Sequence, residues 1–570
     1  MKPTFYLAAS LALLSTGLLT GCGNDDEAPA ATAQEEAPQN PAEHLLRYIP
    51  ADSPYYVATR EALPEEDVFT LYQRMPMDSM ESDLDELRQS LPEIDDPGLR
   101  AIVQVLLAVG EELMGVETLD DVHALGLKMS PHSALYGLGI LPVLRFELED
   151  EASFRTTFER VLERAEIQPR TATTDGTEYW ILSSGEGPLQ AIMTIIDGQA
   201  LLSVVPSDAS DALLAEVMGK TLPDENIDDS GALEALEERH AFTPGGAGRV
   251  DTARLFAELS DPQHAGTTAL LDATDTQPLD LSSCQGDIDR LTGRFPGLVM
   301  GMREYSLERM ELNLILQTDE EIVGDLRDMI APVPGMGATN GIASVGLGLD
   351  LPMLLQTVQR YGQAVRENPF TCEELRDLNG TWDELNMALN NPITLMLGSS
   401  LSGLNARIDS LYMKAGAPTL TGVLTLASQN PMGLISTASA FLPELGMLGL
   451  EPGGETKRVE SMMLPPEVPP LYAAMSDSAL ALSSGEDTKA PQAALDAETS
   501  DRDLLFYSHF TGELYTALAD VLDQTPNEEM TASDIEMLRQ YGDVYRLMEY
   551  WVRVDDAGVE MGLSMELENE

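Results

Sequence analysis

The chain has 570 residues, of which 43% are hydrophobic, so it is too apolar for a disordered protein and long enough for two to four domains. Its 96 acidic residues against 33 basic ones give a formal net charge of −63, and they are spread over the whole length. This charge excludes nucleic acid as a partner, because nucleic-acid binding depends on clustered Lys and Arg. It is typical of adaptation to a saline, halophilic setting, where salt screens the repulsion between carboxylates.

The first segment has the pattern of a secretion signal. One basic residue, Lys2, precedes an apolar stretch from Phe5 to Leu19. This stretch is shorter than the about 20 residues that a membrane-spanning helix needs. We therefore predict a signal peptide over residues 1–21.

The next four residues, Leu19-Thr20-Gly21-Cys22, resemble the lipobox of bacterial lipoproteins. The resemblance implies that Cys22 becomes the lipid-modified N-terminus, palmitate being one such acyl group, and that the protein attaches to a membrane through this lipid. Gly23 stands where lipoproteins retained in the inner membrane often have Asp, which favours the outer membrane, facing the periplasm. An ordinary cleaved signal with an incidental cysteine is the alternative.

The residues after Cys22 are predicted to form a flexible acidic tether over 22–43. They are rich in Ala, Pro, Asp and Glu and nearly free of large apolar side chains, so they lack the means to form a core. The remaining residues resemble the folded regions of uncharacterised bacterial lipoproteins. That resemblance implies no particular activity.

Two stretches of the folded region share one order of predicted elements. In the first, a strand ending near Glu147 precedes a helix with one apolar face, two strands meet at Asp197-Gly198, and a helix opens near Ser210. In the second, a strand from Pro418 precedes a helix over Leu434 to Leu442, and further strands and a helix follow. The apolar face of the first helix is formed by Phe154, Phe158, Val161, Leu162 and Ala165.

The similarity extends beyond these stretches, because each half also begins with a strand and a helix and closes with a short strand, a helix and a hairpin. We therefore predict an α+β fold of two tandem divergent copies of one module, with antiparallel sheets and packed helices, over 44–335 and 336–570. Long helical insertions are expected near residues 80–125 and 370–405. Chance similarity between generic α+β segments is the alternative.

The closing hairpins make the prediction specific. Apolar side chains alternate along the last strand of each hairpin, which predicts that this face is turned to the core. In the expected alignment, Leu312, Leu314 and Leu316 occupy places equivalent to Leu563, Met565 and Leu567.

Besides Cys22, the chain contains two cysteines, Cys284 and Cys372. Disulfides persist in exported proteins, so we predict that these two pair. The pair closes a loop of roughly 88 residues. In the chain-entropy model, such a cross-link stabilises the folded state by about 4 kcal/mol. Because the two cysteines flank the expected junction, the bridge would fix one copy against the other. Alternatively, both are small buried hydrophobic residues.

A search for catalytic, cofactor and metal motifs gives no assignment. The six histidines show no zinc-binding spacing, and the glycines around Tyr136 to Pro142 lack a nucleotide-binding pattern. The serines Ser399, Ser400 and Ser402 do not have the G-x-S-x-G spacing of a nucleophile elbow. With 96 acidic residues, some carboxylate pairs fall close together by chance. The histidines are His44, His123, His132, His240, His264 and His509.

Apolar residues give the remaining signal. The chain has 27 methionines, and residues 98–116 and 430–452 are apolar around most of a helix, which is typical of buried core helices. Our first hypothesis is a non-catalytic envelope lipoprotein that binds a lipid or a hydrophobic protein in a groove within or between the copies. The alternative is a periplasmic hydrolase that cleaves envelope polymers through a carboxylate pair.

Overall fold

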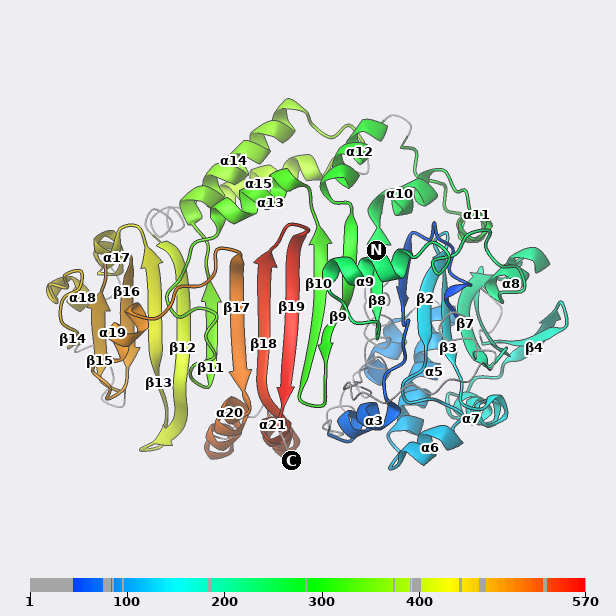
Figure 1. Ribbon diagram of the computed structural model, residues 1–570, viewed down its shortest axis with the longest axis horizontal. Helices are drawn as coiled ribbons and strands as arrows, with labels where there is room; N and C mark the ends of the chain where they lie inside the picture. The colour runs from blue at the N-terminus through cyan, green and yellow to red at the C-terminus, as the bar shows by residue number, and fades with distance from the viewer. Residues whose placement is uncertain are drawn as a thin grey trace, which may run out of the picture. The chain divides into compact units, whose positions relative to one another are not determined.

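The computed structural model describes residues 45–74, 84, 87–94, 97–182, 187–281, 284–372, 375–389, 391, 401–439, 443–460, 468–525 and 530–568 (Figure 1). The fold combines helices with antiparallel strands and is of the α+β class. The predicted signal, the lipobox cysteine and the tether lie outside the described residues.

The chain divides into two compact units. The first contains the residues up to Asp280 together with Pro296–Leu312, and the second contains Leu281–Phe295 and Asn313–Glu570. The division therefore falls after Leu312 rather than at the expected 335/336 boundary. One excursion of the chain, Leu281–Phe295, packs with the second unit before the first unit is complete.

Nine strands of the first unit form an antiparallel sheet. Neighbouring strands pair in the order β4-β5-β6-β7-β3-β2-β1-β8-β9. These strands are β1 (Tyr55–Ala58), β2 (Ser133–Leu138), β3 (Leu141–Glu147), β4 (Arg170–Thr174), β5 (Thr177–Ile181), β6 (Leu189–Ile196), β7 (Gln199–Pro206), β8 (Ala247–Asp251) and β9 (Gly297–Tyr305). A further strand, β10 (Arg309–Gln317), pairs with β9 and contains the division between the units.

The helices of the first unit fill the connections between these strands. They are α3 (Glu65–Arg74), α5 (Pro97–Leu113), α6 (Leu119–Ala124), α7 (Glu151–Arg164), α8 (Asp211–Val217), α9 (Ala232–His240), α10 (Thr252–Ser260) and α11 (Ala265–Ala273), with the short 3₁₀ helix η1 (Leu91–Glu93). The expected apolar helix over 98–116 corresponds to α5, which packs on α7 and β6. Its Val105 and Ala108 share a core with Phe158, Trp180 and Met193.

Local sequence explains several element boundaries. Asp197 and Gly198 both adopt positive φ, which matches the twist of a two-residue hairpin and joins β6 to β7. Asp150 caps α7 by accepting a hydrogen bond from the Ser153 backbone N–H at 2.7 Å. Phe154 and Phe158 on the buried face of α7 then contact the sheet.

The strand order of the second unit matches that of β5-β6-β7-β3-β2-β1-β8-β9-β10, and β4 has no counterpart in it. Its strands pair in the order β14-β15-β16-β13-β12-β11-β17-β18-β19, and all pairs are antiparallel. They are β11 (Ala343–Leu347), β12 (Leu401–Lys414), β13 (Ala417–Ser428), β14 (Lys457–Val459), β15 (Leu471–Met475), β16 (Ala479–Ser484), β17 (Leu504–Thr511), β18 (Tyr545–Val554) and β19 (Gly558–Leu567).

Helices of the second unit lie at both ends of its strands. Figure 1 shows α13, α14 and α15 near one end of the strands and α20 and α21 at the opposite end. The helix expected over Leu434 to Leu442 lies partly outside the described residues, which here show two short helices, α17 and α18. The helices are α12 (Gln285–Arg294), α13 (Glu320–Met329), α14 (Leu351–Glu367), α15 (Leu378–Leu389), α17 (Pro431–Ala438), α18 (Pro443–Met447), α19 (Ala490–Leu495), α20 (Gly512–Gln524) and α21 (Ala532–Val544).

A disulfide joins two segments of the second unit. The Sγ atoms of Cys284 and Cys372 are 1.94 Å apart, with a Cα–Cα distance of 5.2 Å. Cys284 is the N-cap residue of α12, and Cys372 follows α14. The expectation that this bridge fixes one copy against the other is wrong, because α12 itself packs with the second unit.

Candidate functional site

The sheet of the second unit has one face formed almost entirely by apolar side chains. Residues paired across antiparallel strands project to the same face, so the register identifies its members. One row across the sheet contains Leu482, Leu424, Ala406, Val345, Ser508, Tyr550 and Leu563. The flanking rows add Leu347, Leu404, Leu426, Phe506, Val552 and Met561 on one side, and Ala343, Ile408, Phe510, Met548 and Met565 on the other. We call this set the apolar face.

Within the described ranges, helices cover the apolar face only along its margins. On one side, α20 packs Leu514 and Leu518 against Phe510 and its neighbours. On the opposite side, α13 packs Val323 against Val554. The β13–β16 end of the face is covered by α17 and α18, which share a core with Leu426, Leu480 and Leu482.

The centre of the apolar face is partly open. Val345 is 40% exposed and Tyr550 is 37% exposed, and Leu404, Phe506 and Leu563 are half-buried. Side chains of this kind in the middle of a sheet are ordinarily buried. Contiguous exposed apolar surface in a protein marks an interaction site more often than chance.

The opposite face of the same sheet is polar and buried. His509, Ser564, Thr425 and Asn405 on this face are all buried. The segments 331–341 and 497–500 cross it, since Val333 and Met336 pack on Tyr507 and Trp551. The segments are tied together by the Ser500 N–H, which donates to the Val333 carbonyl at 3.0 Å.

Hydrogen bonds between strands satisfy several of the buried polar groups. Ser344 and His509 are joined by a 2.7 Å contact between Oγ and Nδ1. The Tyr507 hydroxyl donates to Glu549 at 2.7 Å. The Trp551 indole N–H donates to Glu560 at 3.2 Å. Burial of this face therefore rests in part on paired polar groups, since Asn405 Oδ1 and Ser564 Oγ are buried without a hydrogen-bond partner among the described residues.

The expectation that the apolar residues of the closing hairpins face the core holds for Leu567, which is buried, and is wrong for most of the other residues. In β19, Glu560, Gly562 and Ser564 are buried, whereas Leu563 and Met565 are half-buried. In β10, Ile315 is fully buried at 0% exposure, and Leu316 is 36% exposed. Buried and half-buried residues do alternate along β19, as expected, but the segments that cover this strand lie on its polar side.

Carboxylates surround the apolar face. The helix α20 carries Glu513, Asp520 and Asp523 and no basic residue. On α13, Glu321 has 59% of its side chain exposed and pairs with Arg294 at 2.9 Å. Asp520 and Asp523 are each 65% exposed, and Arg539 of α21 approaches both. Acidic residues therefore outnumber basic ones on α20, and Arg294 and Arg539 offset part of the charge of Glu321, Asp520 and Asp523.

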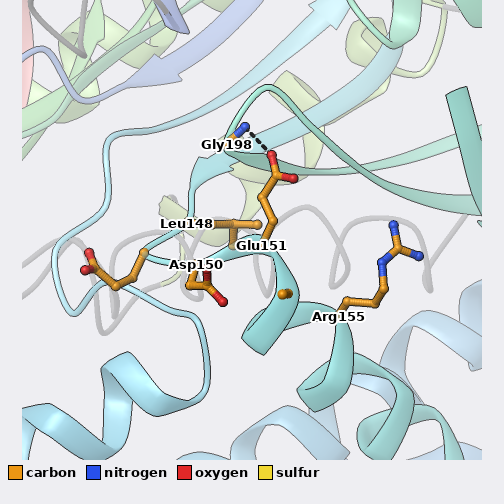
Figure 2. Close-up of a pocket in the computed structure, with 7 residues that line it drawn as sticks. Leu148, Asp150, Glu151, Arg155 and Gly198 are labelled. Carbon is orange, nitrogen blue, oxygen red and sulfur yellow. Dashed lines mark hydrogen bonds between the residues drawn. The ribbon is translucent and has the colours of Figure 1, made fainter.

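A hollow of about 640 Å³ occurs in the first unit at the N-terminus of α7. Figure 2 shows Asp150, Glu151 and Arg155 around it, with Arg155 directed away from Asp150. Two of its carboxylates have a structural partner: Asp150 caps the helix, and Glu151 accepts from the Gly198 N–H at 2.7 Å. The Arg155 guanidinium lies 4.6 Å from the centre of the Trp180 ring. Asp150, Glu151 and Arg155 therefore have structural roles, and Glu149 is a further carboxylate of the lining.

The described histidines have structural roles. His264 caps α11 through Nδ1 and contacts Glu216 through Nε2 at 2.9 Å. Burial opposes its charge, but the Glu216 carboxylate outweighs this effect and raises the pKa of His264. The other contacts join His123 to Glu65, His132 to Glu147 and His240 to the ring of Phe242, and His509 pairs with Ser344 as described above. His44 lies outside the described residues.

The Ser344–His509 pair is the arrangement that most resembles a nucleophile and its base. Both residues are buried, and the second ring nitrogen of His509 lies 3.5 Å from the Gly341 carbonyl. Burial lowers the pKa of His509, which favours the neutral ring. A substrate has no access to a hydroxyl in this position, so the pair joins β11 to β17. Of the serines considered from sequence, Ser402 is buried in β12, and Ser399 and Ser400 lie outside the described residues.

Glu237 and Glu147 have pKa values shifted in opposite directions, as a catalytic acid and base would. Burial raises the pKa of Glu237, against the effect of its hydrogen bond from Arg60 at 2.8 Å. Burial also opposes the charge of Glu147, yet hydrogen bonds from His132 and Lys128 lower its pKa to about 2. Glu237 and Glu147 are each held by a basic partner, as expected for structural ion pairs.

Across the described ranges, no three His, Cys, Asp or Glu side chains are placed to hold a metal ion. No helix in those ranges combines the length and the apolar run that crossing a membrane requires. Comparisons with protein-family models, with curated proteins and with solved structures find no match to this chain.

Proposed function

We propose that this protein is a non-catalytic envelope lipoprotein that binds an apolar ligand or protein partner on the apolar face of its second unit. The observation that carries the proposal is the partly open centre of that face, where Val345 and Tyr550 are the most exposed members. Phe and Met side chains around them offer a large and adaptable contact area. Water contact with such a surface is unfavourable, so covering it contributes binding free energy.

The anchoring part of the proposal rests on the lipobox. Acylation of Cys22 would attach the chain to a membrane, and Gly23 favours the outer membrane, with the folded units in the periplasm. A saline environment fits the formal charge of −63, since salt screens the carboxylates. For the alternative hydrolase, the carboxyl groups of Glu147 and Glu237 give no support, since each is paired with a basic side chain.

We also infer that the two units are divergent copies of one module. The support is topological: β5-β6-β7-β3-β2-β1-β8-β9-β10 pair in the same spatial order as β14-β15-β16-β13-β12-β11-β17-β18-β19, and β4 has no counterpart. In both units, a helix also follows the third strand and another follows the strand that pairs with it, as α7 and α8 do in the first and α17 and α19 in the second. Agreement of the two strand orders by chance is unfavoured, because each order places strands side by side that are far apart in the sequence.

Nile red, a neutral apolar dye, tests the binding site. We expect the full chain to bind the dye, and the double substitution Val345→Asn with Tyr550→Asn to weaken binding by about tenfold, because about 1.4 kcal/mol of apolar contact would be lost. The measurement is a fluorescence titration at constant salt.

Leu222→Asn is the matched control, since Leu222 is 47% exposed but belongs to the first unit. It should leave dye binding unchanged. Equal binding by the chain and by the double variant would contradict the proposed site.

A further inference from the structure

The chain itself shows how an apolar helix packs on one of its sheets. In the first unit, Val105 and Ala108 of α5 lie in one core with Met193 of β6 and Ala200 of β7. Ion pairs hold this helix against α7, the helix that follows β3. Arg160 and Arg164 of α7 approach Glu112 of α5 at 3.2 and 3.0 Å. Apolar packing and charge pairing thus act together in this helix–sheet contact.

The charges are reversed around the apolar face of the second unit. The helices that follow β13 there, α17 and α18, contain no Lys or Arg, and α18 contains Glu444. The helix α20 on another margin contains three acidic residues and no basic one. A helix that packs on the centre of this face would therefore lie beside α20, which carries carboxylates and no basic group.

We propose that the occupant of the apolar face is a helical segment of a partner protein, with an apolar stripe on one side and Lys or Arg beside it. This inference rests on the proposed function and specifies its ligand. Five strands, from β12 to β19 through β11, β17 and β18, span about 20 Å at the usual strand spacing. A helix of about 14 to 18 residues covers that width.

The shape and charge of the face favour a helix over a lipid. Lipid chains are ordinarily enclosed in a pocket that removes most of their surface from water, whereas the centre of this face is open. Anionic headgroups would also be repelled by a chain of formal charge −63. A basic amphipathic helix satisfies both the apolar centre and the acidic margin, as in other helix-in-groove complexes.

Three synthetic peptides of about 18 residues test the inference with the full chain. The first has a Leu and Phe stripe with Lys on its other side, the second replaces Lys by Glu, and the third is a scrambled form of the first without the stripe. Fluorescence anisotropy measures binding, and Nile red displacement locates it. We expect the Lys peptide to bind and to displace the dye, and the Glu and scrambled peptides to bind at least about tenfold more weakly.

The variants separate site from charge. The double substitution Val345→Asn with Tyr550→Asn should weaken binding of the Lys peptide by about tenfold. Leu222→Asn should weaken it by less than about twofold. Both Asn substitutions keep the net charge, so a loss of binding reports the apolar face. Raising the salt concentration should reduce the preference for Lys over Glu.

Each other outcome overturns a defined part of the proposal. If the dye binds at the face but the Lys peptide does not displace it, the binding site stands and the helical occupant is wrong. If phosphatidylcholine vesicles displace the dye and the peptide does not, the helical occupant is also wrong. It is wrong too if the double substitution dissociates a dimer of this chain, because a second copy would then occupy the face. Equal binding of the scrambled peptide would show attraction by charge alone. If neither dye nor peptide responds to the double substitution, the site itself is wrong.

Discussion

Arg145 shows how a single buried cation is held by neutral groups. Its side chain is fully buried, and its guanidinium donates to the Tyr136 hydroxyl at 3.0 Å, to Gln199 at 3.3 Å and to the Val217 carbonyl at 2.8 Å. The ring of Tyr48 lies 4.0 Å below it. The planar guanidinium reaches acceptors in three directions, which a Lys ammonium on a flexible stem does not reproduce.

Arg145→Ala should therefore lower the free energy of unfolding by about 3 kcal/mol or more, because it leaves a cavity and removes three hydrogen bonds. Arg145→Lys should recover only part of the loss. Urea unfolding followed by circular dichroism measures both variants. Arg155→Ala is the control, since the Arg155 side chain is 41% exposed and its loss should cost less than about 1 kcal/mol. A loss at position 145 no larger than at position 155 would refute the structural role.

In the second unit, a disulfide and several side-chain contacts hold α12 against the loop after α14. Besides the disulfide, one carboxylate oxygen of Asp287 accepts from the Thr371 N–H at 2.6 Å and from its hydroxyl at 2.7 Å. Arg290 donates to the Asn368 carbonyl at 2.9 Å and lies 4.2 Å from the ring centre of Phe370. Hydrogen bonds to Thr371 and Cys372 outweigh desolvation and lower the pKa of Asp287.

We expect non-reducing peptide mapping to recover Cys284 and Cys372 as one linked pair. Cys284→Ser with Cys372→Ser should destabilise the second unit by about 2 to 4 kcal/mol, because the unfolded chain loses a cross-link. Hydrogen exchange should rise in α12 and at the end of α14, while β3 and α7 of the first unit provide the internal reference. Labelling of both thiols in folded protein would contradict the bridge.

For the whole molecule, we propose that the chain attaches to a membrane through a lipid on Cys22. The described residues contain no helix suited to crossing a bilayer, and the lipobox resemblance assigns attachment to Cys22. We expect Cys22→Ser to release the protein into the soluble fraction, since the acyl chains supply the membrane affinity. Detergent partitioning and globomycin sensitivity of processing measure this. Retention of the variant in membranes after a high-salt wash would show that another anchor exists.

The order of elements could be predicted from sequence because it depends on local patterns. Asp197-Gly198 marks a hairpin through its turn conformation, and the spacing of Phe154 and Phe158 marks one face of a helix. The expected strands near Glu147 and Val552 correspond to β3 and β18. These signals extend over a few residues, so they persist whatever the rest of the chain does.

The candidate site could not be predicted in this way. Alternation along β19 distinguishes two faces, but it does not state which face other segments will cover. Glu560 and Ser564 are buried because residues 331–341 and 497–500, far away in sequence, cross their side of the sheet. The Trp551 indole N–H then donates to the buried Glu560 carboxylate.

The sequence by itself determined the α+β class, the succession of strands and helices and the acidic character of the surface, since these follow from composition, periodicity and turn residues. Only the tertiary structure decided which side of each strand is buried and that α12 packs with the second unit. Both depend on contacts between distant segments. Leu563 and Met561 became part of a partly open apolar face for the same reason: the covering segments bind to the opposite side of their sheet.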